Sequence, residues 1–149
     1  MEKQCGFNTY IINCYNLADI PYSSKSSGIC ADVYAPTNTV NLYIKNCYNK
    51  GTVLGELAAG ITTIYNPNNI TANVENAYYL EASANIGVYH FETETDLENP
   101  QYDTATRLSD AQMKAQSFVD DLNANIEDID TEYDLRKWKL VAASYPEFE

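Results

Sequence analysis

The stretch RLSDAQMKAQSFVDDLNANIEDI, residues 107–129, carries the strongest structural signal in the chain. Ser109 followed three residues later by Gln112 forms a capping box, and Leu108 and Met113 are placed for a hydrophobic staple. Apolar residues then recur at helical spacing, namely Ala111, Ala115, Phe118, Val119, Leu122, Ile126 and Ile129. The pattern predicts one amphipathic helix over residues 108–129, with an apolar face that the rest of the chain must cover.

A second helix is expected to follow the first. Asp130 or Thr131 can cap its start, and Pro146 would end it. Four residues of the segment fall on one helical face: Leu135, Trp138, Val141 and Ala142. The segment after residue 130 is therefore predicted to be helical.

The part of the chain before these helices has the composition of strands. Residues 6–16 and 29–35 are rich in aromatic and β-branched residues, and residues 39–49 alternate between apolar and polar side chains. These patterns predict three strands. The sequence LADIPYSSKSSG at 17–28 predicts a loop, because proline and a serine and glycine cluster interrupt regular structure.

The apolar segment at residues 52–65 is expected to form two short strands on either side of Gly60, because glycine costs a helix interior about 1 kcal/mol. A short helix over 53–59 is the alternative. Residues 76–83 and 86–95 predict two further strands, which a turn would join as a hairpin. Strands first and helices last is the order of an α+β domain.

We therefore expect a single α+β domain over residues 1–149. An antiparallel or mixed sheet would come from the N-terminal two-thirds, with 1–97 mainly β and 108–145 mainly α. Two C-terminal helices would cover one face of that sheet. A parallel βαβ layout is disfavoured, because helical periods do not alternate with strands.

An internal similarity links two of the predicted strands. YIINCYN at residues 10–16 and YIKNCYN at residues 43–49 agree at six of seven positions, with Tyr10 aligned to Tyr43. Two equivalent strands would place Cys14 and Cys47 in equivalent environments, whereas a chain this rich in tyrosine and asparagine could also repeat itself locally. The similarity stops at both ends, so the sequence does not support a solenoid repeat.

Charge is divided unevenly along the chain. Residues 1–74 carry four acids and four lysines, whereas residues 75–149 carry seventeen acids and five bases, which accounts for the whole net charge of −12. Phosphate contacts need a basic surface, so direct nucleic-acid binding is disfavoured. The acidic half can instead form a solvated surface or bind a basic partner. The acidic surface is expected at Asp120, Asp121, Glu127 and Asp128.

The ends and the cysteines bear on the cellular compartment. No apolar run is long enough to cross a membrane, and MEKQCGFNTY at residues 1–10 is not a secretory signal. We therefore expect synthesis in the cytoplasm, with incorporation into a particle as one outcome. The cysteines are expected as free thiols, and a framework of two disulfides is the alternative; they are Cys5, Cys14, Cys30 and Cys47.

No cofactor and no catalytic residue is predicted. On a strand, four side chains would point to one face and could hold a divalent cation, namely His90, Glu92, Glu94 and Asp96. A solvated acidic strand is the stronger interpretation. An EF-hand-like start at Asp121 places Ile126 where the calcium loop needs a glycine turn, so the helical interpretation is preferred there. Nothing local marks any cysteine as activated by His90.

Tyrosine is the most informative residue type for function. Its ring is apolar and its hydroxyl can bond to water, so it is enriched at protein interfaces. The interface residues expected on or beside strands are Tyr10, Tyr15, Tyr43, Tyr48, Tyr78 and Tyr79. The alternative is that these are ordinary half-buried strand tyrosines.

Three functions follow from these observations. The first is a non-enzymatic structural protein of a repeating assembly, such as a head, neck or tail component of a virus or phage particle. Its partners would be other protein subunits, in a homo-oligomer or a larger complex, without a membrane. The second is an acidic inhibitor or nucleic-acid mimic that binds a basic partner. The third is a small hydrolase that uses His90.

Overall fold

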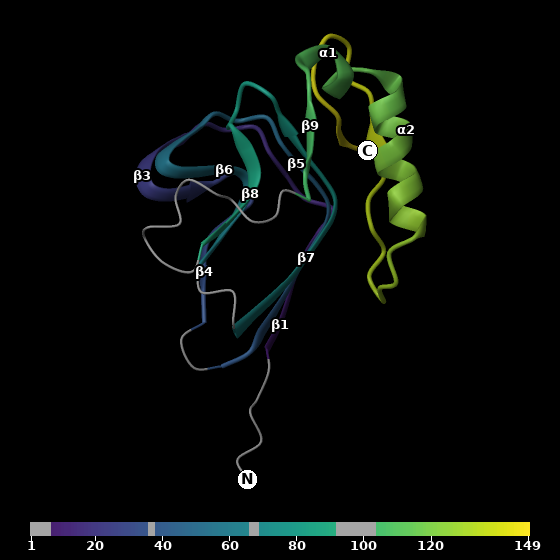
Figure 1. Ribbon diagram of the computed structural model, residues 1–149. Helices are drawn as coiled ribbons and strands as arrows, with labels where there is room; N and C mark the ends of the chain where they lie inside the picture. The colour runs from purple at the N-terminus through teal and green to yellow at the C-terminus, as the bar shows by residue number, and fades with distance from the viewer. Residues whose placement is uncertain (1–6, 36–37, 66–68, 92–103) are drawn as a thin grey trace.

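The computed structural model describes residues 7–35, 38–65, 69–91 and 104–149 (Figure 1). Their backbone winds as stacked coils, in which strands alternate between two parallel sheets. The first coil contains β1 (Phe7–Ile12), β2 (Tyr15–Asn16), β3 (Ile20–Ser27) and β4 (Cys30–Tyr34). The second contains β5 (Val40–Asn49) and β6 (Val53–Tyr65), the third contains β7 (Ile70–Leu80) and β8 (Ile86–Phe91), and β9 (Thr106–Leu108) follows.

The first sheet has the strand order β1-β5-β7-β9, with β2 also paired to β5. In the second sheet β3, β4 and β8 all pair with β6. Every pairing in both sheets is parallel. Each strand therefore lies beside its counterpart one coil away, which is the arrangement of a β-solenoid.

The predicted antiparallel or mixed sheet under two C-terminal helices is wrong. The described chain is mainly strand, its two large sheets are parallel, and its helices are short. Parallel neighbours need a long connection, which is usually a helix. Here the connection is the strand of the opposite sheet, so a parallel architecture forms without alternating helical periods.

The spacing between the two similar segments is one coil of this structure. Tyr10 pairs with Tyr43, and Tyr15 pairs with Tyr48, in the register of β1 and β2 on β5. The interpretation as equivalent strands is confirmed, and the prediction against a solenoid is wrong. The next coil is shorter, since Phe7 pairs with Val40 and Val40 in turn pairs with Ile70. Coils of unequal length hide the repeat from a search at a fixed period.

An asparagine bend recurs in the first sheet. Asn13, Asn46 and Asn76 have positive φ angles of 54°, 53° and 49°, a left-handed conformation that asparagine tolerates better than most residues. The Asn46 Nδ2 donates to Asn13 Oδ1 at 2.9 Å. The bend therefore stacks from coil to coil and turns each strand at the same level.

Two of the three apolar clusters in the described residues form layers that join the coils to each other and to the C-terminal region. The larger one lies between the two sheets and includes Leu42, Ile44, Ile61 and Ile64, each at most 1% exposed. The other lies between the outer face of the first sheet and the C-terminal region, where Figure 1 shows α2 (Gln116–Glu127) alongside the strands. The second layer is aromatic. It contains Tyr48, Phe118 and Trp138, together with Met113, Val119 and Leu122.

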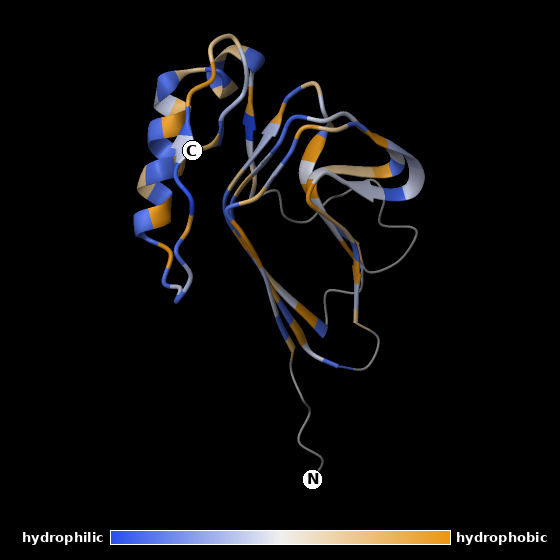
Figure 2. Ribbon diagram, turned by 180° about the vertical axis from the view of Figure 1, so that it is seen from behind, coloured by the Kyte–Doolittle hydropathy of each residue, from blue (hydrophilic) through white to orange (hydrophobic). Residues whose placement is uncertain are grey.

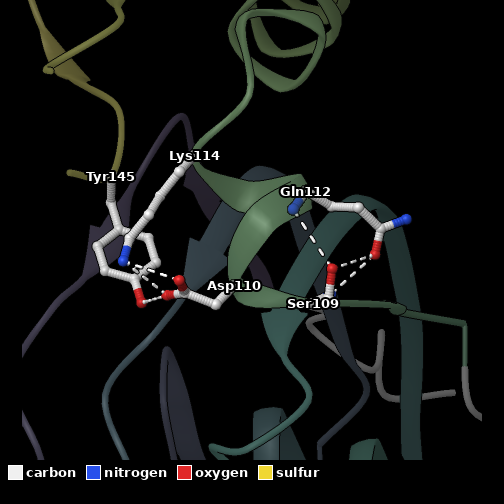
Figure 3. Close-up of polar contacts among 5 residues, drawn as sticks. All are labelled: Ser109, Asp110, Gln112, Lys114 and Tyr145. Atoms are coloured by element: carbon white, nitrogen blue, oxygen red, sulfur yellow. Dashed lines mark hydrogen bonds and ion pairs between the residues drawn. The ribbon is translucent and has the colours of Figure 1, made fainter. Parts of the chain in front are cut away.

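The predicted helix over 108–129 is interrupted. It forms as α1 (Asp110–Met113) and α2, and Ala115 between them is an extended N-cap at φ −87° and ψ 150°. The capping box of Ser109 and Gln112 is confirmed (Figure 3). The interruption allows Met113 of α1 and Phe118 of α2 to enter the same apolar layer, and no glycine or proline in the sequence announces it.

The Asp110 carboxylate ties α1 to the C-terminal segment (Figure 3). It accepts a hydrogen bond from the Lys114 Nζ at 2.9 Å and another from the Tyr145 hydroxyl. These bonds lower the pKa of Asp110, the lysine contact first. Burial, followed by the contact with Asp110, raises the pKa of Tyr145 to about 12.

The predicted second helix does not form. Residues after 130 instead make a short antiparallel pair of β10 (Trp138–Lys139) and β11 (Glu147–Phe148). The Asn123 side chain bonds both the backbone N–H of Trp138, at 2.8 Å, and its carbonyl, at 2.9 Å. Trp138 also donates its indole N–H to Asn13 Oδ1 at 2.7 Å. These long-range bonds use backbone groups that a helix would need.

Three local predictions also change. Residues 17–28 contain β3 rather than a loop, and residues 52–65 form the single strand β6 without a break at Gly60. A Cβ at Gly60 would lie 2.6 Å from the Cβ of Tyr79, so this glycine allows close packing of the two sheets. The predicted hairpin is wrong, because β7 and β8 lie in different sheets.

Candidate interaction edge and adjoining pocket

The first coil forms one edge of each sheet. Within the described residues, β1 and β2 pair only with β5, and β3 and β4 pair only with β6. Large side chains of this coil face solvent: Phe7 is 56% exposed, Tyr10 59% and Tyr22 67%. An edge strand presents backbone N–H and C=O groups to which another chain can pair. This surface, residues 7–34 with their open edge, is called the first-coil edge below.

Side-chain ladders reinforce this edge. The Tyr10 and Tyr43 rings stack with centroids 4.8 Å apart, and the Asn41 Nδ2 donates to Asn8 Oδ1 at 2.8 Å. Both pairs join the first coil to the second. Figure 2, a view from behind, shows that α2 lies beside only one end of this sheet. Cross-strand contacts between rings and between amides therefore join the first-coil edge to the second coil.

A pocket of about 540 Å³ adjoins the first-coil edge. Tyr10, Ile11, Ile12 and Cys14 line it from the first coil, and residues 130–133 with Leu135 line it from the C-terminal segment. Its walls are largely apolar, with carboxylates contributed by Asp130 and Glu132. It is large enough to hold a small molecule or a side chain of a partner.

Two cysteines meet beside this pocket. Cys14 and Cys47 directly precede the paired residues Tyr15 and Tyr48, so they occupy facing positions on adjacent strands. Both are free thiols; Cys14 is exposed and Cys47 is 0% exposed. The neighbouring Cys47 thiol lowers the pKa of Cys14 to about 7, whereas the neighbouring Cys14 and burial raise the pKa of Cys47.

The tyrosines predicted at an interface have different environments. Tyr10 is exposed and Tyr43 is half-buried beside it. Tyr48 and Tyr79 are 0% and 2% exposed and pack inside the chain, where they are unavailable to another subunit. Tyr15 and Tyr78 are partly buried in the aromatic layer under α2. Of the six predicted interface tyrosines, only Tyr10 and Tyr43 therefore lie on an open surface.

The remaining predicted positions are dispersed. Asp120, Asp121, Glu127 and Asp128 are exposed on α2 and its C-terminal cap. His90 is half-buried on β8, and burial lowers its pKa. Its predicted companions lie outside the described residues; they are Glu92, Glu94 and Asp96. The described part of the chain contains no group of three or more potential metal ligands.

Sequence reasoning does not locate the first-coil edge or its pocket. The available signal is the similarity between residues 10–16 and 43–49, because it aligns Cys14 with Cys47 and Tyr10 with Tyr43. Periodicity along one strand does not show which strand lies at an edge. The position of the 130–135 segment over the pocket depends on long-range bonds, so it is also beyond a local pattern.

Comparison with known proteins gives no assignment: no protein-family model, no curated protein and no solved structure matches the chain. No helix among the described residues is long and apolar enough to cross a membrane.

Proposed function

We propose that this chain is a non-enzymatic structural subunit that contacts other protein subunits through its first-coil edge. The observation that carries the proposal is the combination of an open parallel-strand edge with exposed aromatic side chains on the same coil. Exposed aromatic patches and unpaired strand edges are both typical of surfaces that bind another chain.

The backbone of β1 defines the chemistry of this contact. The amides of Phe7 and Asn13 donate to carbonyls of the second coil at 2.9 Å each. Alternate residues of a strand direct their amides to opposite sides, so Asn8, Tyr10 and Ile12 direct theirs away from β5. A partner strand can accept hydrogen bonds from these groups and extend the sheet by β-strand addition.

A second copy of this chain is the partner that the charge distribution favours. Residues 7–34 contain two carboxylates and one lysine, whereas residues 75–149 contain seventeen acids and five bases. Contact between two first coils therefore brings only a small net charge of each coil together. A two-fold axis would place β1 antiparallel to β1 of the other copy, which makes a closed and self-complementary interface.

Proline at Asn8 tests this interface. Asn8→Pro removes a backbone N–H group that points away from β5 and places the proline ring at the open edge of the sheet. An edge strand tolerates proline at such a position. Asn8→Ala is the matched control, since it removes the side-chain bond with Asn41 but keeps the amide. We expect the native chain to dimerise, and the proline variant to raise the dissociation constant at least about tenfold relative to the alanine variant.

Light scattering across a concentration series measures the association, and circular dichroism checks that each variant is folded. A native chain that stays monomeric at every concentration contradicts the self-association. Equal dissociation constants for the proline and alanine variants would place the interface elsewhere on the molecule.

A further inference from the structure

We infer that Cys14 is a modification site for low-molecular-weight disulfides, and that Cys47 resolves the adduct into a disulfide bond between the first two coils. The inference does not depend on the proposed subunit contact. The register of the strands brings together two free thiols that lie one full coil apart along the chain.

The backbone around the two cysteines supports a direct cross-link. The Tyr48 amide donates to the Cys14 carbonyl at 3.1 Å, and the Asn13 amide donates to the Lys45 carbonyl at 2.9 Å. These bonds fix the two strands on both sides of the cysteine pair. Adjacent strands lie about 4.8 Å apart, which falls within the Cα separation of about 4.4–6.8 Å that disulfides span.

The two thiols have different access to a reagent. Cys14 is exposed and lines the pocket of about 540 Å³, whereas Cys47 is 0% exposed in the layer between the sheets. The Cys47 Sγ also contacts backbone carbonyls, that of Lys45 at 3.2 Å and that of Ile11 at 3.6 Å. A reagent therefore reaches Cys14 first. The buried Cys47 thiol lies on the adjacent strand, where it can attack the Cys14 adduct.

The reaction has two exchange steps. The Cys14 thiolate attacks one sulfur of the reagent disulfide, forms a mixed disulfide, and releases one small thiolate that takes a proton from water. The Cys47 sulfur then attacks the Cys14 sulfur, and its proton passes to the second small thiolate as that thiolate leaves. Two protein thiols are oxidised to one disulfide, and the reagent disulfide is reduced to two thiols.

The neighbouring Cys47 thiol also changes the acidity of Cys14. With its pKa lowered to about 7, Cys14 is about half ionised at pH 7, roughly 16 times the thiolate fraction of an ordinary thiol. The lower basicity weakens each thiolate about fivefold. These two effects largely offset each other, so the exposure of Cys14, rather than its acidity, directs the reagent to this thiol.

Oxidised glutathione is the probe for the experiment, and peptide mapping is the readout. Trypsin cleaves after Lys3, Lys25, Lys45 and Lys50, so Cys47 lies alone in peptide 46–50 and Cys14 lies in peptide 4–25. A Cys5→Ser variant removes the other cysteine from the longer peptide. In this variant we expect peptides 4–25 and 46–50 to be joined by a disulfide after oxidation at pH 7.

Two single variants on the same Cys5→Ser background separate the steps. With Cys47→Ser, the glutathione adduct should accumulate on peptide 4–25, because no thiol resolves it. With Cys14→Ser, peptide 46–50 should remain unmodified while the chain is folded, as checked by circular dichroism. The inference is overturned if Cys47 reacts as fast without Cys14, or if the oxidised Cys5→Ser chain keeps the glutathione adduct with no cross-link.

Discussion

Replacement of Asn46 by alanine should destabilise the fold far more than replacement of its counterpart one coil away. Asn46 is 0% exposed, and its Nδ2 donates to Asn13 Oδ1 at 2.9 Å and to the Leu122 carbonyl at 3.0 Å. Its Oδ1 accepts from Asn125 at 3.3 Å. The side chain therefore joins two coils to α2, at a backbone position with a positive φ angle of 53°.

The expected cost has two parts. Alanine in the left-handed conformation costs about 1 kcal/mol, because its Cβ approaches the following carbonyl oxygen. The substitution also leaves buried groups, chiefly the Leu122 carbonyl, without their hydrogen bonds. This loss costs about 2 kcal/mol more. The total is about 3 kcal/mol. At the equivalent residue Asn76, which has φ 49° but is exposed, water can replace the lost contacts and only the backbone cost of about 1 kcal/mol remains.

Urea unfolding followed by the fluorescence of Trp138, the single tryptophan and 1% exposed, measures the free energy of unfolding of both variants. We expect Asn46→Ala to be less stable than Asn76→Ala by about 2 kcal/mol, or about thirtyfold in the equilibrium constant. Asn46→Gly should recover about 1 kcal/mol, since glycine removes the backbone cost alone. Equal losses at Asn46 and Asn76 would refute the idea that the asparagine stack anchors α2.

Three further perturbations test other contacts. Gly60→Ala should cost about 1–3 kcal/mol in urea unfolding, because the new Cβ would meet the fixed Cβ of Tyr79 at 2.6 Å; unchanged stability would mean that the sheets can separate there. Tyr48→Phe should cost about 1 kcal/mol through loss of the hydrogen bond to the Pro146 carbonyl, and unaltered protease resistance and stability would show that this bond does not hold the C-terminal segment. Burial lowers the pKa of His90 in the folded chain, so the unfolded chain binds its proton more tightly and stability should fall as the pH drops from about 6.5. His90→Gln should flatten that slope in urea titrations above the pH range of the carboxyl groups, and an unchanged slope would assign it to another group.

Local sequence chemistry predicted the start of α1 but not its end. The capping box needs only Ser109 and Gln112, three residues apart, and it forms as expected. The break after Met113 depends on which side chains enter the aromatic layer beneath Tyr48, on a strand far earlier in the chain. No residue near Ala115 is unsuited to a helix, so packing rather than propensity decides the break.

The region after residue 130 fails as a prediction for a similar reason. Trp138 and its neighbours carry a helical pattern, but Asn123 bonds both backbone groups of Trp138, and Asn13 accepts its indole N–H. Each of these bonds connects residues far apart in the sequence or in different elements. Helical periodicity reports only on residues that are close along the chain. It therefore predicts the wrong element where distant side chains form hydrogen bonds with the backbone groups that a helix would use.

Residue identity links the first two coils, but the third coil is recognised only when residues at the same position in each coil are compared. Along the inner face, Cys14, Cys47 and Ala77 are successive positions of one stack, and coil lengths change between them. An interior position needs a side chain of suitable size rather than one residue type. The residue can therefore differ from coil to coil while the side chains still stack. Equivalence of position also differs from equivalence of environment. Cys47 lies between two coils and is 0% exposed, whereas Cys14 lies at the edge and is exposed. That difference, which no alignment of the two segments contains, is what gives the pair one accessible thiol and one protected thiol.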